Sequence, residues 1–141
     1  MHFAIFILIF CLQQPALNTN DNLAIQGFDP VSYFSNDPRK GNSKYQSTFN
    51  TATYYFVSEE NRRKFTNNPQ KYEPEYGGWC AFAMGNDGTK VKVDPETFKI
   101  VDGKLYLFYN FLWTNTLPLW NENEVVLRAK ADENWQETTK N

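Results

Sequence analysis

The 141-residue sequence is poor in the side chains that bind metals or move protons. It contains one histidine, His2, and two cysteines, Cys11 and Cys80. If the N-terminal segment is removed on export, no histidine remains, which excludes histidine-based triads, histidine metal sites and histidine proton shuttles. Cys80 is then the single cysteine of the mature chain, so no internal disulfide can form.

The sequence also lacks a large excess of charge and a long apolar run. Its 14 basic and 16 acidic residues give a net charge of -2 without a basic block, which argues against nucleic-acid binding. The apolar stretch from Phe3 to Leu12 is too short to span a bilayer. Hydrophobic residues at 41% and charged residues at 21% are typical of one folded globular domain.

The first 20 residues are predicted to be a signal peptide followed by a polar linker, with the folded domain in residues 21–141. The apolar run has the length of a signal-peptide core, Pro15 ends it, and Ala16 offers a small residue for cleavage. A lipid anchor on Cys11 and a retained anchor helix are the alternatives. We therefore expect an exported protein, periplasmic or secreted, that meets the membrane only through its export signal.

Aromatic residues are abundant, and they predict the core and the fold. The 12 Phe, 8 Tyr and 4 Trp make up 17% of the sequence. Aromatic and β-branched runs on both sides of Asn50–Ala52 predict one hairpin, and Asp102-Gly103 predicts another. Ser58 is the predicted cap of a helix that ends before Pro69. These patterns predict an α+β fold, with a small antiparallel sheet flanked by short helices in a single domain.

The remaining elements are expected from shorter signals. They are a strand at 23–27, a short helix after Asp29-Pro30, a buried helix from Trp79 to Met84 closed by Gly85, a strand at 90–93, a turn at Asp94-Pro95, a largely helical stretch at 110–130 interrupted by Pro118, and a closing helix at 129–136. Trp135 is expected to dock this last helix on the core.

Two sets of residues resemble a known family. The first set is an aromatic strand followed by a capped helix, from Tyr54 to Phe65, and it continues through Pro69 to Tyr72. The second set comprises Gly27 to Phe34, Tyr76 to Ala81, Ile100 to Leu107 and Lys130 to Trp135. Together they resemble the YHS domain, in its exported, stand-alone bacterial branch, over nearly the whole chain from Asn22 to Trp135.

The resemblance implies the fold of that family and a link to heavy-metal handling, often of copper. Family members commonly carry cysteines where the aromatic strand meets the helix, and in this sequence Val57 and Asn61 stand at those two positions. We expect Val57 in the core, Asn61 in solvent, and no metal at this junction.

Cys80 and Met84 are the soft donors that remain in the mature chain. Their spacing of four residues places a thiolate and a thioether on one face of a helix, and such a pair suits Cu(I). In the simpler interpretation the helix is buried, the cysteine acts as a small hydrophobe and the methionine fills gaps. A redox or persulfide role of Cys80 is the third alternative.

Asp29, Tyr33, Tyr76, Trp79 and Asp94 are the candidates for lining a ligand pocket. The aromatic candidates are expected near the glycine pair that follows Tyr76, where backbone can approach a ligand closely. Core packing is the competing explanation for the rings. Turn and helix-cap roles are the competing explanation for the two aspartates, because each of them precedes a proline.

The sequence contains no phosphate-binding loop, nucleophile elbow, paired-cysteine motif or dinucleotide fingerprint, so an enzyme is not expected. We predict an exported binding module of the YHS type, with a link to copper handling through Cys80 and Met84. One alternative is a structural or protein-interaction domain without metal. The other is a redox or accessory protein that acts through Cys80. The partner is expected to be a protein or a metal ion.

Overall fold

The aromatic strand predicted at residues 53–57 lies inside the largest sheet. In the computed structural model, which describes residues 16–140, β4 (Ala52–Phe56) pairs antiparallel with β3 (Asn42–Phe49) and parallel with β2 (Leu23–Ala24). β1 (Thr19–Asn20) pairs with the outer side of β2. The first predicted hairpin is thus confirmed, whereas the stretch expected to be a polar linker contributes a strand.

Helix α1 (Glu59–Asn67) begins at the predicted cap. The Ser58 hydroxyl accepts a hydrogen bond from the backbone N–H of Asn61 at 3.1 Å. Glu59 and Glu60 occupy the first turn, where the helix dipole favours negative charge. The short helix α2 (Pro69–Tyr72) follows, with its proline in the first turn.

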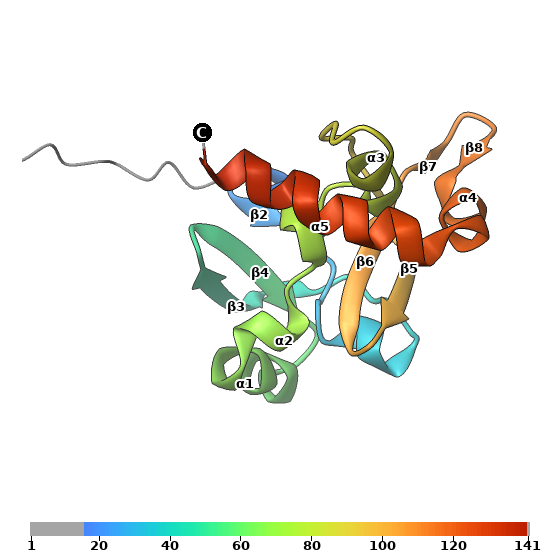
Figure 1. Ribbon diagram of the computed structural model, residues 1–141. Helices are drawn as coiled ribbons and strands as arrows, with labels where there is room; N and C mark the ends of the chain where they lie inside the picture. The colour runs from blue at the N-terminus through green and yellow to red at the C-terminus, as the bar shows by residue number, and fades with distance from the viewer. Residues whose placement is uncertain (1–15, 141) are drawn as a thin grey trace, which may run out of the picture.

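Phe65 anchors α1 on the sheet. Its side chain is 1% exposed, and its ring centroid lies 4.7 Å from that of Tyr54, 5.2 Å from that of Phe56 and 6.2 Å from that of Phe49. Phe65 therefore determines which face of α1 packs on the sheet. In Figure 1, α1 and α2 lie beside the β3–β4 hairpin, at the opposite end of the molecule from α4.

A second hairpin divides the core into two clusters. It consists of β5 (Asp94–Val101) and β6 (Lys104–Phe108), joined by the predicted turn at Asp102-Gly103. On β6, the two leucines at 105 and 107 belong to the first cluster, which also holds the aromatic residues of β4. Residues 106 and 108 alternate with them and belong to the second cluster. Both faces of β6 are therefore buried, which explains its uninterrupted apolar sequence.

Three helices cover the second cluster: α3 (Ala81–Asn86), α4 (Thr116–Glu122) and α5 (Glu124–Lys140). Trp120 of α4 is fully buried, 5.5 Å from each of the rings of Tyr106 and Phe108. Figure 1 shows α5 crossing over the β5–β6 hairpin and α3. The α+β fold in a single domain is thus confirmed.

Several local expectations are wrong. Gly85 lies inside α3 and does not close it, and a Cβ there would be 2.5 Å from the Leu127 carbonyl oxygen of α5. Pro118 does not interrupt a helix, because it lies in the first turn of α4, where its missing N–H has no partner to lose. The break between α4 and α5 falls at Asn123 instead.

The segment 90–93 was expected to be a strand, but it pairs with no strand. The Val91 carbonyl accepts a hydrogen bond from the Cys80 N–H at 2.9 Å, so this segment runs beside the residue that precedes α3. Asp94-Pro95 belongs to β5 and not to a loop, and the strand is irregular between Asp94 and Phe98. The predicted short helix after Asp29 is the 3₁₀ turn η2 (Ser32–Ser35), and the strand expected at 23–27 ends in the 3₁₀ turn η1 (Ile25–Gly27).

Residues 110–115, expected to be helical, form a projecting hairpin of β7 (Asn110–Phe111) and β8 (Thr114–Asn115). Leu112 and Trp113 form its turn with φ angles of 48° and 72°, and their side chains are 84% and 105% exposed. Left-handed backbone is unfavourable for large side chains, and such turns normally use Asn or Gly. This turn therefore stores strain that no burial of its side chains offsets.

Within residues 16–140, no helix combines the length and the apolar composition that crossing a bilayer requires. The predicted signal peptide falls almost entirely in residues 1–15, which lie outside the described residues.

We predict that Phe65→Ala lowers the free energy of unfolding by about 3–5 kcal/mol, because it removes a fully buried ring and leaves a cavity. Chemical denaturation followed by tryptophan fluorescence measures the loss. A loss below about 1 kcal/mol would contradict the packing of α1 on the sheet.

We also predict that the double variant Leu112→Asn, Trp113→Gly is more stable than the wild type by about 1–2 kcal/mol, because Asn and Gly tolerate left-handed backbone. Thermal and denaturant unfolding measure the gain. The control Leu112→Ala, Trp113→Ala removes the same apolar surface but keeps two Cβ atoms. An equal gain in the control would show that backbone strain is not the cause.

Candidate functional site

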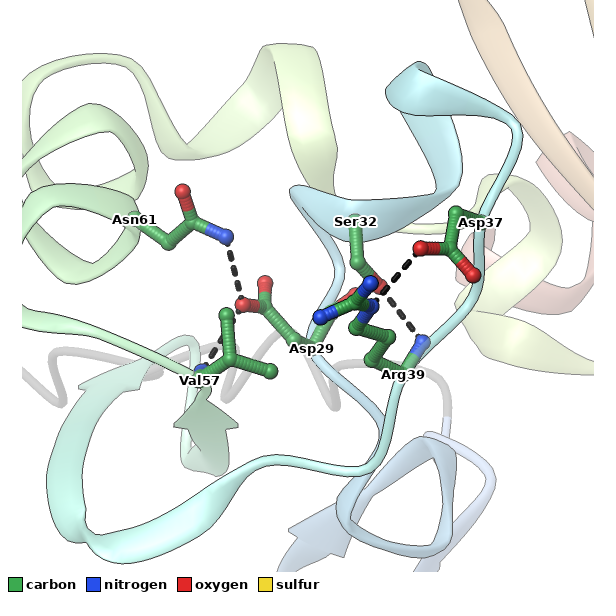
Figure 2. A network of polar contacts seen from close by, with 6 residues as sticks. All are labelled: Asp29, Ser32, Asp37, Arg39, Val57 and Asn61. Carbon is green, nitrogen blue, oxygen red and sulfur yellow. Dashed lines mark hydrogen bonds and ion pairs between the residues drawn. The ribbon is translucent and has the colours of Figure 1, made fainter.

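Asp29 holds the junction between β4 and α1 together. Its side chain is fully buried, and Oδ1 accepts a hydrogen bond from the Val31 N–H at 2.8 Å. Oδ2 accepts one from the Val57 N–H at 2.9 Å and one from Asn61 Nδ2 at 2.8 Å. Figure 2 shows Val57 and Asn61 meeting the carboxylate from the strand end and the helix.

A second set of bonds fixes the loop that carries Asp29. The Ser32 hydroxyl donates to the Asp29 carbonyl at 2.6 Å and accepts from the Arg39 N–H at 2.9 Å. Arg39 also pairs with Asp37 at 2.7 Å on the surface (Figure 2). The network is polar but internally satisfied, so it accounts for Asp29 as a structural residue.

Two expectations for this junction are wrong. Val57 was expected in the core, but it is 36% exposed. Asn61 was expected in solvent, but its amide binds the buried Asp29 carboxylate. At the two positions that the YHS resemblance equates with cysteines, the chain thus presents N–H donors to a carboxylate, where a metal ion would need electron-pair donors.

We predict that Asn61→Ala costs about 1.5–3 kcal/mol of stability, because a buried carboxylate loses a charge-assisted hydrogen bond. Urea unfolding measures the cost. Arg63→Ala is the control on the same helix, where an exposed side chain should contribute about 0.5 kcal/mol or less. Equal losses in both variants would contradict the role of the Asn61–Asp29 bond.

Cys80 and Met84 are both fully buried, and they belong to different clusters. Cys80 precedes α3, and its Sγ accepts a hydrogen bond from the Tyr109 N–H at 3.3 Å and lies 3.5 Å from Thr116 Oγ1. A cavity of about 230 Å³ lies beside Cys80, and Met84 does not line it. The Cu(I) pair stays a prediction, and this packing favours the interpretation of both residues as core.

A larger cavity, of about 480 Å³, lies where the N-terminal segment meets the loop before α3. Its walls come from four parts of the chain: residues 16–19 with 24–25, the β3–β4 turn with Tyr54, residues 73–78, and Trp135 of α5. Ligand pockets in proteins typically have volumes of about 300–1,000 Å³. This cavity therefore has the size of a site for a small organic molecule.

The loop at 75–78, η3 (Glu75–Gly78), shapes one wall. Tyr76 and Gly77 both adopt left-handed backbone, with φ angles of 56° and 61°. Asn18 holds this loop: its N–H donates to the Gly77 carbonyl, and its Nδ2 donates to the Gly78 carbonyl, each at 2.9 Å. The chain thus binds its N-terminal segment and the glycine pair into one wall.

Trp135 closes the cavity against Gly77. A Cβ on Gly77 would lie 2.8 Å from the indole ring and 3.1 Å from a methyl group of Leu17. The position therefore requires glycine both for its backbone conformation and for the close approach of the ring. Trp135 docks the closing helix on the core, as predicted.

Glu73 and Glu75 are the charged side chains of the cavity wall. Both are half-buried, and no hydrogen bond or ion pair from residues 16–140 reaches either carboxylate. Burial raises the pKa of Glu73, and the negative charge of Glu75 raises it further. Burial also raises the pKa of Glu75, an effect that Lys104 opposes and Asp132 reinforces.

Two tyrosines complete the polar lining. The Tyr76 hydroxyl donates to Asp132 Oδ1 at 2.8 Å. Burial raises the pKa of this hydroxyl most, and the hydrogen bond to Asp132 raises it further. The Tyr54 side chain is 3% exposed, yet its hydroxyl makes no hydrogen bond within the described chain. Since no fully buried side-chain N or O atom there lacks a partner, this hydroxyl keeps some accessible surface, and Tyr54 is one of the residues that line the cavity.

Of the five residues predicted to line a pocket, the structure places Tyr76 in the cavity wall. Tyr33 is buried against Phe98 and donates to the Pro95 carbonyl. Trp79 donates from its indole to the Ala16 carbonyl at 2.9 Å. Asp29 and Asp94 cap turns; Asp94 accepts from the Glu96 N–H and the Thr97 hydroxyl. None of these four lines either cavity.

The sequence reasoning missed Glu73, Glu75, Tyr54 and Trp135. The available signal was the segment Glu73 to Gly78, where two carboxylates flank a proline just before an aromatic residue and two glycines. Residues 16–140 hold no group of three or more His, Cys, Asp or Glu side chains that could bind a metal ion.

No protein-family model, curated protein or solved structure matches this chain. The resemblance to the YHS domain therefore stays a prediction that rests on the quoted residues.

Proposed function

We propose that this protein is an exported binding module, of the YHS type, that holds a small organic molecule in the cavity between its N-terminal segment and Trp135. One observation carries the proposal: a cavity of about 480 Å³ is lined by aromatic rings and by polar groups without partners. Apolar walls with a few convergent polar groups are typical of small-molecule sites.

The cavity is built as a fixed part of the fold. The three hydrogen bonds from Asn18 and Trp79 that join residues 16–18 to residues 77–79 are each 2.9 Å long. Tyr76 adopts left-handed backbone in this wall, and residues in sparsely populated backbone regions cluster at ligand-binding sites. Catalysis is not part of the proposal, because the wall contains no nucleophile paired with a base.

Binding of small fragments to the wild type and to two tryptophan variants tests the proposal. We predict that a panel of neutral, anionic and cationic fragments contains binders that shift the NMR signal of the Trp135 indole N–H. Thr19→Trp places a large ring from β1 in the cavity and should abolish these shifts.

Asn20→Trp is the matched control, since neighbouring residues of a strand point to opposite faces and Asn20 is exposed outside the cavity. It should bind as the wild type does. If no fragment binds the wild type, or if Thr19→Trp binds as well as Asn20→Trp does, the cavity is not the site.

A further inference from the structure

Resting on the proposed function, we infer that the ligand of this cavity is a small organic cation, an ammonium ion held by Glu73 and Glu75 against the rings of Tyr54, Tyr76 and Trp135. The charge, the unpaired groups and the aromatic lining of the cavity all favour this class of ligand.

The charge of the wall has one sign. Among the described residues that line the cavity, Glu73 and Glu75 are acidic and none is basic. Lys104 acts on Glu75 from outside the wall, and Asp132 adds a further negative charge behind Tyr76. An anionic ligand would therefore be repelled. A cation would neutralise the negative charge of the two carboxylates, which repel each other.

The combination of partial burial and no partner distinguishes these two carboxylates from the other acidic residues of the described chain. Glu59 pairs with Arg62, Glu124 with Lys99, and Asp102 with Arg128. Within residues 16–140, no comparable donor reaches Glu73 or Glu75, although both are more buried than an exposed surface acid. An ammonium group supplies the missing donors, because each of its N–H bonds can donate to a carboxylate oxygen.

The aromatic lining favours a cation for a second reason. The faces of Trp and Tyr rings attract cations, and the attraction increases when the cation leaves water. Trp135, Tyr76 and Tyr54 all line the cavity. The unpaired Tyr54 hydroxyl, on a side chain that is 97% buried, can accept a further hydrogen bond from the same ammonium group.

The size and the number of ligands favour an organic cation over a metal ion. A calcium ion takes six to eight oxygen ligands and a magnesium ion demands an octahedral set, whereas two separate carboxylates and a phenol offer few. The volume of about 480 Å³ also leaves room for a carbon skeleton beside the charged group.

The two glutamates also affect the free energy of unfolding. The sign of this effect distinguishes a binding role of the carboxylates from a structural one. Their folded pKa values are raised, so the folded chain binds more protons than the unfolded chain, and stability falls as the pH rises through these values. At neutral pH the unliganded protein should therefore become more stable when Glu73 or Glu75 is replaced by Gln. A structural ion pair would give the opposite result.

Calorimetric titration with three probes of one shape tests the inference: phenethylamine, 2-phenylethanol and phenylacetate. The wild type should bind the amine at least about tenfold more tightly than the alcohol, and the acid least. Glu73→Gln and Glu75→Gln should each lower the amine affinity by about tenfold while leaving the alcohol affinity unchanged. Glu133→Gln, which removes the same charge from the exposed face of α5, should leave all three affinities unchanged.

The pH dependence provides a second measurement. The titratable groups facing or adjoining the cavity are Glu73, Glu75, Tyr54 and Tyr76, with Asp132 and Lys104 behind them. Burial raises the pKa of both glutamates, so they take up protons at a higher pH than exposed glutamates do. Since the amine stays protonated, its affinity should fall as the pH is lowered and the two glutamates become neutral.

The outcomes separate the two proposals. If the alcohol binds as tightly as the amine and the Gln variants change neither affinity, the cavity binds small molecules but the cation is wrong. If none of the three probes binds the wild type, the inferred ligand class fails, and the Trp135 shifts with the wider panel decide whether the cavity binds anything. If the Gln variants lose amine binding and lose stability as well, Glu73 and Glu75 are structural and the inference is overturned.

Discussion

The burial of both faces of β6 is the constraint on which the rest of this fold depends. A strand whose successive side chains point to opposite sides needs a cover on each side. The leucines at 105 and 107 are covered from the side of the four-stranded sheet, and Tyr106 and Phe108 are covered by the helices that carry Trp120 and Leu127. The long helix α5 and the aromatic hairpin therefore belong to one domain although they do not form one layer.

Hydrogen-bonded polar groups fix the alignment of these layers. Asp29 ties the turn after β2 to the junction of β4 and α1, and the Tyr33 hydroxyl ties that turn to the start of β5. Burial raises the pKa of the Tyr33 hydroxyl, and it stays a donor to the carbonyl of Pro95. The aromatic side chains of the core thus bury apolar area and, through their hydroxyl groups, also fix how the elements are positioned relative to one another.

The elements that could be predicted from the sequence carry strong local signals. Asp102-Gly103 favours a tight turn and Ser58 favours a helix start, whatever the rest of the fold. The hairpin and α1 were therefore predicted correctly. The Lys-Val alternation at 90–93 has the pattern of a strand, but its backbone pairs with Cys80 and not with a strand. Gly85 resembles a helix-ending glycine in the sequence. The structure requires glycine there because α5 packs closely against it, a contact that no local pattern predicts.

The cavity was harder to predict than the fold, because its walls come from distant parts of the chain. Tyr76 was predicted from the glycine pair beside it, a local signal. In the sequence, Glu73 and Glu75 have the pattern of ordinary surface acids. The other walls of their cavity come from Trp135, about sixty residues further along, and from residues before β1. Val57 and Asn61, the two positions that the YHS resemblance equates with cysteines, bind the Asp29 carboxylate, a role that the sequence pattern did not predict.

The bonds from Asn18 to the glycine pair link the formation of the cavity to the processing of the chain. A cut after Asn18 would remove the residue that holds both carbonyls and the leucine that backs Gly77, whereas a cut after Ala16 would leave both in place. The fold behind the cavity, from β2 to α5, would keep its two clusters. If the chain is cleaved on export, as proposed, the position of the cut decides whether the folded domain has a complete cavity.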